Sequence, residues 1–339
     1  MFHKSTTMRF KDQRVTVTGA AGFIGRKLVE QLLAEGAKVT AVDLPGVQFP
    51  QWNGVECVHS DLSDAAQLRQ LCSQKDLIFH LAFPVSDWEK EEKFQDAIKH
   101  SEEICRLAAV TGTRLVITTS VVVYADQIGK GPITEETPFG KPNGHYMAYK
   151  QKQERIALQY AHEHKADIRI VRPANVYGAG SKPWVIEVAR VLAKGVPSLI
   201  DGGKGRAGLV LVDNLVEVLL LTAKGELSRG EIFLAVDDNT VTWHDYFAAI
   251  AGFIQADAPK SMPRFLAEIA ATGGELIWKT LGLTGRPPLT RQALMLVGAD
   301  NDFKNDKIKR VLGFQPVKTH EQGMREIAAF LAQNTWQEK

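Results

Sequence analysis

The feature of this sequence that most constrains its fold is a repeated order of short apolar segments, each followed by a segment with the apolar spacing of a helix. The pattern runs from about residue 14 to residue 172. The apolar segments lack the alternation of a half-exposed strand, which indicates strands buried on both faces. Such strands are parallel, and right-handed helical crossovers cover both sides of their sheet. The sequence therefore predicts an α/β fold with a doubly wound parallel sheet.

After Arg172 the pattern changes to short elements separated by glycines and prolines. The expected strands of the first part are 14–18, 38–42, 55–59, 76–80, 115–119 and 168–171, and the expected helices are about 23–35, 64–73, 89–110 and 146–164. Strands at 208–212 and 232–236, with a helix from Asn214 between them, return to the sheet. We predict a Rossmann-type domain over residues 8–175, completed by 208–236. We also predict a smaller, mostly helical substrate-binding region over 176–207 and 237–339, whose two parts alternate along the chain with those of the Rossmann-type domain.

Charge, cysteines and histidines exclude several classes of partner. Lysine and arginine number 41 and aspartate and glutamate 39, so the net charge of +2 gives no basis for a nucleic acid partner. Cys57, Cys72 and Cys105 are too far apart for a Cys-x-x-Cys motif, and the nine histidines form no zinc-type cluster. We predict no metal, and the few cysteines fit a reducing compartment.

Two segments bear on membrane association and location. Residues 1–13 are polar and lack the apolar core, roughly 7–15 residues long, of a signal peptide. The most apolar candidate for a span, 262–283, carries several charged residues and is instead typical of an amphipathic helix that covers a site or an interface. We therefore predict no membrane span and a cytoplasmic location.

Three glycines mark a candidate phosphate-binding turn. Gly19, Gly22 and Gly25 lie where the first expected strand turns into its helix. Glycines there let the backbone approach a pyrophosphate, whose charge then lies at the N-terminus of the helix. A lone glycine motif is weak evidence, since a plain tight turn gives the same pattern. Its place between a strand and an amphipathic helix favours a dinucleotide site.

Asp43 ends the second expected strand, 18 residues after Gly25. A carboxylate there accepts hydrogen bonds from both ribose hydroxyls of NAD and repels the additional phosphate of NADP. The alternative is an aspartate that only forms the turn before Leu44-Pro45-Gly46. Because Asp43 and the glycine turn are in register, we predict NAD as the cofactor. From this part of the chain it would be held by Gly19, Gly22, Phe23, Ile24, Gly25, Asp43 and Leu44.

Tyr146 and Lys150 form a candidate acid–base pair. Their spacing of four residues places both on one face of a helix. A tyrosine that acts as a base near pH 7 needs its pKa lowered by about three units, or roughly 4 kcal/mol. One nearby ammonium supplies about this amount before desolvation is subtracted. Tyr-x-x-x-Lys is common by chance, so the pair needs support from other residues.

Ser120 supplies that support. It lies at the carboxyl end of the apolar segment 115–119, where open α/β sheets bind their ligands. Its hydroxyl can hold the oxygen of a substrate while Tyr146 moves the proton. The alternative is a serine that only caps a turn. The glycine turn, Asp43, Ser120 and the Tyr146/Lys150 helix all fall where one doubly wound sheet would bring them together.

These residues resemble the extended short-chain dehydrogenase/reductases. The resemblance lies in Thr18-Gly-x-x-Gly-x-x-Gly25, Asp61-Leu62, His80-Leu-Ala82, Ser120-x-x-x-Tyr124 with Tyr-x-x-x-Lys further on, and Arg172-Pro-Ala-Asn-Val-Tyr-Gly178. It implies that Asp61 and Leu62 contact the adenine of NAD. It also implies that Leu81, Ala82 and Phe83 line the ribose, and that Pro173, Asn175 and Val176 lie at the nicotinamide. A homodimer is implied as well.

The C-terminal part narrows the resemblance to one branch. Pro287-Pro-Leu-Thr290-Arg291, Phe303 and Leu312-Gly-Phe314 are similar to the 3β-hydroxysteroid dehydrogenase-like branch. There are departures from the wider family. The segment 96–101 lacks a common Asn and Gly-Thr, and Val121-Val122 stand where sugar-nucleotide 4,6-dehydratases carry acidic residues. Leu211 replaces a histidine of many sugar-nucleotide enzymes, which weakens a nucleotide-sugar interpretation.

We therefore predict an NAD(H)-dependent oxidoreductase that interconverts a secondary alcohol and a ketone, with Ser120, Tyr146 and Lys150 as catalytic residues. The substrate is expected to be a mainly hydrophobic small molecule, steroid-like or a β-hydroxy/β-keto alkyl compound. Apolar residues of 262–296 are expected to cover it, although such residues usually pack into a core. One alternative is a nucleotide-sugar epimerase with the same triad. The other is a non-catalytic NAD(H)-sensing protein, which the complete triad disfavours.

Overall fold

A computed structural model describes residues 8–238, 240–283, 285–333 and 336. Its centre is a seven-stranded parallel sheet with the order β10-β6-β5-β4-β1-β2-β3. The strands are β1 (Arg14–Thr18), β2 (Lys38–Asp43), β3 (Glu56–His59), β4 (Leu77–His80), β5 (Arg114–Thr118), β6 (Ile168–Pro173) and β10 (Ile232–Ala235). The order of strands reverses between β1 and β4, and ligands of doubly wound sheets bind at this switch point. The predicted fold class is confirmed.

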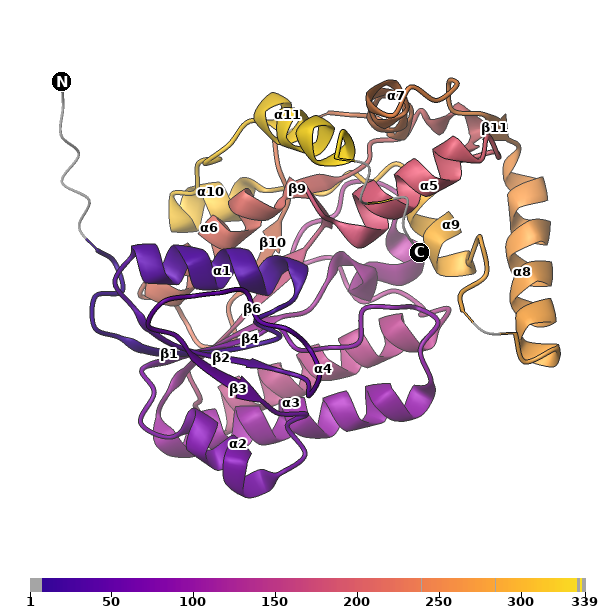
Figure 1. The fold of residues 1–339 in the computed structure, drawn as a ribbon. Coiled ribbons are helices and arrows are strands. Elements are labelled where there is room, and N and C mark those ends of the chain that lie inside the picture. Colours follow the sequence, from indigo (N-terminus) through magenta and orange to yellow (C-terminus); the bar gives the residue numbers. More distant parts are fainter. Residues whose placement is uncertain (1–7, 239, 284, 334–335, 337–339) are drawn as a thin grey trace, which may run out of the picture.

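Helices cover both faces of the sheet (Figure 1). One face carries α1 (Phe23–Ala34) and α6 (Val212–Lys224), and the other carries α2 (Ala65–Cys72), α3 (Glu91–Thr111) and α4 (His145–Glu163). Successive strand residues alternate between the two cores: Ile78 packs toward α3 and α4, whereas Phe79 packs toward α1 and α6. This burial on both faces explains why the strand segments are continuously apolar.

The remaining elements lie at the carboxyl edge of the sheet and above it (Figure 1). They include two short parallel pairs, β7 (Asn175–Tyr177) with β9 (Leu209–Leu211) and β8 (Leu199–Ile200) with β11 (Ser261–Met262). The other elements are η1 (Val121–Gln127), η2 (Lys182–Ile186), α5 (Glu187–Ala193), η3 (Asp201–Gly203), α7 (Trp243–Phe253), α8 (Arg264–Thr280), α9 (Arg291–Val297), α10 (Asp306–Leu312) and α11 (His320–Leu331). A separate core around Tyr177, Trp243 and Tyr246 holds α5, α7 and α11 together.

Helix α8 differs from the usual expectation for an apolar stripe. Phe265, Ile269 and Leu276 are 61%, 66% and 62% exposed, and the buried positions of the helix are Ala267, Ala271 and Glu275. Core packing therefore does not account for its apolar residues. Figure 1 shows the helix at the edge of the molecule, from which the chain returns to α9. No helix of the described residues has the length and apolar character needed to cross a membrane.

Candidate active site

The glycine turn between β1 and α1 packs against the chain that follows β4. Gly19 has a φ of +70°, and a Cβ there would lie 2.9 Å from the backbone nitrogen of Ala82. A Cβ on Gly25 would lie 2.1 Å from the Gly19 carbonyl oxygen. Gly22 precedes the first helical turn, which begins with Phe23 and Ile24, and no side chain caps this helix. Gly19 and Gly25 therefore have no room for side chains, and the uncapped helix end can bind a phosphate.

Asp43 lies beside this turn at the end of β2. Its Oδ2 accepts a hydrogen bond from the Ala21 N–H and its Oδ1 accepts one from the Leu44 N–H, both at 2.8 Å. The turn over residues 44–47, the alternative that the sequence left open, is closed by the Val47 N–H and the Leu44 carbonyl at 3.2 Å. The Asp43 carboxylate contacts the first residue of this turn and also the glycine turn. The exposed guanidinium of Arg26, which sequence reasoning missed, donates to the Ala21 carbonyl at 2.8 Å. In the sequence, only its position directly after Gly25 indicates that Arg26 lies at the glycine turn.

Asp61 and Leu62 follow β3 next to Asp43, whose carbonyl accepts the Ser60 N–H at 2.8 Å. The exposed Asp61 carboxylate accepts the N–H and O–H of Ser63 at 2.9 and 2.6 Å, and these bonds hold the pKa of Asp61 below its usual value. Leu62 is buried with a φ of +67°. Both residues lie on the same side of the switch point as the carboxylate of Asp43.

Ser120 and Tyr146 lie close together. Ser120 follows β5 and caps η1, with its Oγ accepting the Val122 N–H at 3.3 Å. The Ser120 side chain is near enough to the phenol of Tyr146 to lower the pKa of that phenol, and Tyr146 lies half-buried in the first turn of α4. The phenol ring stands edge-on to the ring of Phe83, with 6.4 Å between centroids. The fold thus brings together two residues that are 26 positions apart.

Lys150 lies one turn further along α4 and is buried. Its Nζ donates to the Thr118 carbonyl at 3.1 Å and to Gln153 Oε1 at 3.0 Å. It also lies 3.8 Å from the centroid of the Phe83 ring, a favourable distance for a cation over an aromatic face. Phe83, predicted to line the ribose, therefore contacts Lys150 and stands beside Tyr146.

Burial controls the protonation of both groups. It raises the pKa of Tyr146 to about 12, while the nearby Ser120 hydroxyl lowers this pKa and the charge of Asp87 raises it. Burial also lowers the pKa of Lys150 to about 7, opposed by the charge of Glu154. The sequence-based expectation that the ammonium brings the phenol pKa toward neutrality is not met in the protein alone. The reason is that Lys150 is itself desolvated and binds Thr118 and Gln153.

A buried ion pair joins α4 to the ends of β5 and β6. Glu154, one turn beyond Lys150, binds Arg172, and neither side chain is more than 4% exposed. Its Oε2 also accepts the Thr119 hydroxyl at 2.7 Å, and Arg172 donates to the Tyr124 hydroxyl at 2.7 Å. Thr119 precedes Ser120, so this network positions the serine relative to the tyrosine helix. In the sequence, Arg172 stands out only as part of a family segment, and nothing in the sequence indicates a role for Glu154.

The segment after β4 connects this site to the C-terminal part of the chain. The Asp87 side chain is 7% exposed and accepts hydrogen bonds from Arg286 Nε at 2.7 Å and from the Thr290 hydroxyl. The Lys279 Nζ lies 5.6 Å from the centroid of the adjacent Trp88 ring. Asp87 follows Phe83 by four residues, and Phe83 stands beside Tyr146, so these bonds connect the end of α8 and the segment before α9 to the chain that borders the site.

The residues after β6 lie at the same end of the sheet, but they differ in which of their groups a ligand could contact. Pro173 ends β6, and Val176 is half-buried in β7. The Asn175 side chain is buried and donates to the Ala207 carbonyl at 2.7 Å. Its backbone N–H donates to the Gly208 carbonyl at 3.1 Å, so both its amide group and this N–H are used inside the protein. Leu211 is fully buried against Gly323 and offers no surface to a substrate.

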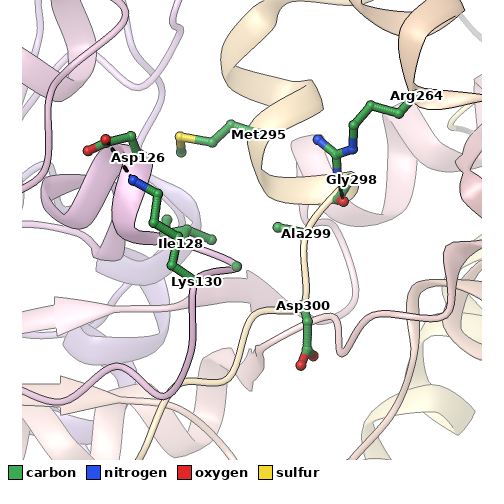
Figure 2. A pocket seen from close by; sticks show the side chains of 9 residues that line it. Asp126, Ile128, Lys130, Arg264, Met295, Gly298, Ala299 and Asp300 are labelled. Carbon is green, nitrogen blue, oxygen red and sulfur yellow. Dashed lines mark hydrogen bonds and ion pairs between the residues drawn. The ribbon is translucent and has the colours of Figure 1, made fainter.

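A surface hollow of about 370 Å³ lies near the segment that begins at Ser120 (Figure 2). It is lined by Asp126, Ile128, Gly129, Lys130, Arg264, Met295, Gly298, Ala299 and Asp300. Lys130 pairs with Asp126 at 3.0 Å, and Arg264 donates to the Gly298 carbonyl. The hollow contains none of the predicted site residues. Over the described ranges, no cluster of histidine, cysteine and acidic side chains could hold a metal ion.

Comparisons with known proteins agree with this geometry. Residues 15–234 match the model of the "NAD dependent epimerase/dehydratase family". A ketoreductase of Stigmatella aurantiaca, named for 4-hydroxy-2-methyl-3-oxo-4-farnesyl-3,4-dihydroquinoline-1-oxide, is 27% identical, over 92% of this chain and 94% of that protein. The human decarboxylating sterol-4-alpha-carboxylate 3-dehydrogenase is also 27% identical, over 94% and 88%.

A solved structure shares the fold. The dTDP-glucose 4,6-dehydratase DesIV of Streptomyces venezuelae, solved with NAD and TYD bound, superposes with a TM-score of 0.74 at 22% identity, over 95% of this chain and 97% of that one. The family match covers more than half of the chain, and the resemblance to the 3β-hydroxysteroid dehydrogenase-like branch is confirmed. The chain belongs to the NAD dependent epimerase/dehydratase family.

Proposed function

We propose that this protein is an NAD(H)-dependent oxidoreductase that interconverts a secondary alcohol and a ketone on a mainly hydrophobic substrate. The observation that carries the proposal is that Tyr146 and Lys150 lie against the end of β5. Lys150 Nζ donates to the Thr118 carbonyl at 3.1 Å, two residues before Ser120, and the ring of Phe83 lies beside both side chains. These groups lie at the carboxyl end of the sheet, one strand from the point where the strand order reverses.

The residues around the glycine turn fit a dinucleotide. At Gly19 and Gly25 the protein's own backbone occupies the space that a side chain would fill, which requires glycine and keeps the turn tight. No side chain caps the start of α1, so its free N–H groups can bind a pyrophosphate. Asp43 would hold the ribose hydroxyls and disfavour the phosphate of NADP, which supports NAD(H) as the cofactor. The bound nicotinamide supplies the acceptor or donor of the hydride. Asp61, Leu62, Leu81 and Ala82 would complete the site.

Tyr146 is the proposed general acid and base. With its pKa raised to about 12, the phenol is protonated near neutral pH and is ready to donate a proton to the oxygen of a ketone. Ser120 would hold the same oxygen. Lys150 would bind the ribose hydroxyls and, when protonated, favour loss of the phenolic proton in the direction of alcohol oxidation.

The proposed substrate is steroid-like or a β-hydroxy/β-keto alkyl compound. The exposed apolar residues of α8 support this, because the end of this helix lies beside Asp87 and Trp88 at the site. Residues 176–207 and 237–339 are proposed as the substrate-binding region. The two named relatives act, by their names, on a farnesyl quinoline oxide and a sterol, both largely apolar. A homodimer and a cytoplasmic location are also part of the proposal.

A substrate panel tests the proposal. The protein would be incubated with NAD⁺ or NADH and with steroids, alkyl hydroxy or keto acids, and UDP- and dTDP-sugars. Absorbance at 340 nm and product masses are followed, and the sugars are also separated by chromatography, because an epimer has the same mass as its substrate and forms without net change in NADH. We expect turnover of the apolar compounds, with the Tyr146→Phe variant as the inactive control. Efficient conversion of nucleotide sugars without turnover of apolar compounds would refute the proposal and support an epimerase. Binding of NADH without any turnover would support a sensor.

A further inference from the structure

A row of five buried side chains runs from Lys150 to Thr18, which lies at the start of the glycine turn. Gln153 accepts from Lys150 Nζ at 3.0 Å and donates from its Nε2 to Ser101 Oγ at 3.0 Å. Ser101 Oγ is 2.9 Å from His80 Nε2, and His80 Nδ1 is 2.7 Å from Thr18 Oγ1. None of the five is more than 3% exposed. The row crosses from α4 through α3 and β4 to β1.

Hydrogen bonding accounts for both polar ends of Gln153 and for both ring nitrogens of His80. A neutral imidazole has one donor and one acceptor, and each neighbouring hydroxyl can take either role, so both tautomers fit. Burial, with smaller contributions from the charges of Lys150 and His100, lowers the pKa of His80 to about 3 and keeps the ring neutral. Buried, fully bonded polar groups are rigid, because breaking any bond leaves an unpaired group in the core.

Each end of the row lies at a part of the proposed cofactor site. Thr18 directly precedes Gly19, and its Oγ1 also accepts the Ala82 N–H at 3.3 Å. At the other end, Lys150 Nζ has two hydrogen-bond acceptors among the described residues, Thr118 and Gln153, so one of its three N–H bonds is left for a ligand. A lysine side chain held by two acceptors no longer rotates among its many rotamers.

We propose that Gln153, Ser101 and His80 are positioning residues that fix Lys150 Nζ relative to the glycine turn, so that the lysine is already in place when NAD(H) binds. This inference rests on the proposed function, because it assigns Lys150 to cofactor binding. Gln153 has the central position, since it is the member that contacts the ammonium. Removing it frees the lysine, whereas the more distant Ser101 acts only through it.

The test measures NADH affinity by fluorescence titration of the full chain, which needs no substrate. Gln153→Met removes both polar ends at similar volume and is expected to weaken NADH binding about tenfold, equivalent to ~1.4 kcal/mol. Ser101→Ala is expected to weaken it less, by about threefold. Gln153→Glu keeps an acceptor for Lys150 and should restore affinity to within about threefold of the wild type.

The matched control is Gln151→Met, two residues away on the same helix. Gln151 is also buried, and its amide donates to the carbonyls of Val123 and Gly140 at 2.8 Å, not to Lys150. It should lose stability to a similar degree but keep NADH affinity within about twofold. Circular dichroism at the assay temperature would show that each variant is folded.

A double-mutant cycle separates positioning from general loss of structure. If Gln153 acts through Lys150, Gln153→Met has no further effect on NADH affinity in a Lys150→Met protein. The inference alone is overturned if the wild type binds NADH and Lys150→Met weakens binding, but Gln153→Met does not. It is also overturned if the two effects multiply, or if Gln151→Met weakens binding equally. A wild type that does not bind NADH would overturn the proposed function and the inference together.

Discussion

The buried pair of Glu154 and Arg172 allows one strong prediction about stability. In Glu154→Gln, an amide of the same shape replaces a carboxylate that accepts hydrogen bonds from Arg172 and from the Thr119 hydroxyl. One oxygen becomes an NH₂ group that faces donors, and the guanidinium remains buried without a counter-charge. Removing one partner of a buried ion pair costs about 3–5 kcal/mol of the free energy of unfolding.

The assay is urea unfolding at pH 7, followed by circular dichroism and tryptophan fluorescence. The control is Glu103→Gln, which breaks the pair with Arg106 on the surface of α3, where both side chains are partly exposed. That variant should cost less than about 1 kcal/mol. A double variant, Glu154→Met with Arg172→Met, should be less destabilised than the sum of its single variants, because it leaves no unpaired charge.

A cost below about 1 kcal/mol for Glu154→Gln would refute this reasoning. Such a result would mean that water or a rearranged side chain reaches Arg172. The ion pair between α4 and the ends of β5 and β6 would then not be shielded from solvent as the structure describes. Additive effects in the double variant would lead to the same conclusion.

Three further predictions concern the proposed site. Tyr146→Phe should leave NADH affinity and the fold unchanged and lower turnover at least about 100-fold, since positioned proton transfer contributes roughly 10²–10⁴-fold; near-normal rates would exclude the tyrosine as acid and base. Asp43→Asn should weaken NADH binding and narrow its preference over NADPH, and an unchanged ratio of the two affinities would argue against the ribose contact. Lys150→Met should change how stability depends on pH. In the native protein the lysine pKa falls from 10.5 to about 7, so between these values the unfolded chain holds a proton that the native chain has lost, and the free energy of unfolding rises with pH. The variant should lack this rise between pH 7 and pH 10 in urea unfolding without cofactor, and parallel curves for the two proteins would contradict it.

The sequence predicts those parts of the fold that depend on local pattern. Apolar segments predict β1, β2, β4, β5 and β6 because strands buried on both faces tolerate few polar residues, whereas the edge strand β3 is mostly exposed although it too lies in an expected strand. The two- and three-residue strands β7, β8, β9 and β11 are too short to show a period, and only β9 lies within an expected strand, 208–212. The periodicity of α8 predicts its helix but not that its apolar side is exposed, because a period does not say what the face meets.

The candidate site likewise contains residues that the sequence predicts and residues that it does not. Glycines at a turn, a carboxylate at a strand end and a Tyr-x-x-x-Lys pair have chemistry that is visible in the sequence itself. The residues that hold Lys150 in place cannot be recognised in the sequence. Gln153 and Ser101 are common residues in helices, and they meet only because α3 and α4 pack together. Asp87 is likewise an ordinary loop residue until Arg286, 199 positions away, reaches it.

The segment from Leu81 to Trp88 limits how this protein can be divided or recombined. Ala82 supports the glycine turn, Phe83 contacts Lys150, and Asp87 holds the chain near Arg286. A fragment that ends after β10 would keep every strand of the sheet but leave the carboxylate of Asp87 without its partners. A C-terminal region exchanged between relatives to alter specificity must therefore contain hydrogen-bond donors for the Asp87 carboxylate, as Arg286 and Thr290 are here. The loop after β4 has to be chosen together with that region.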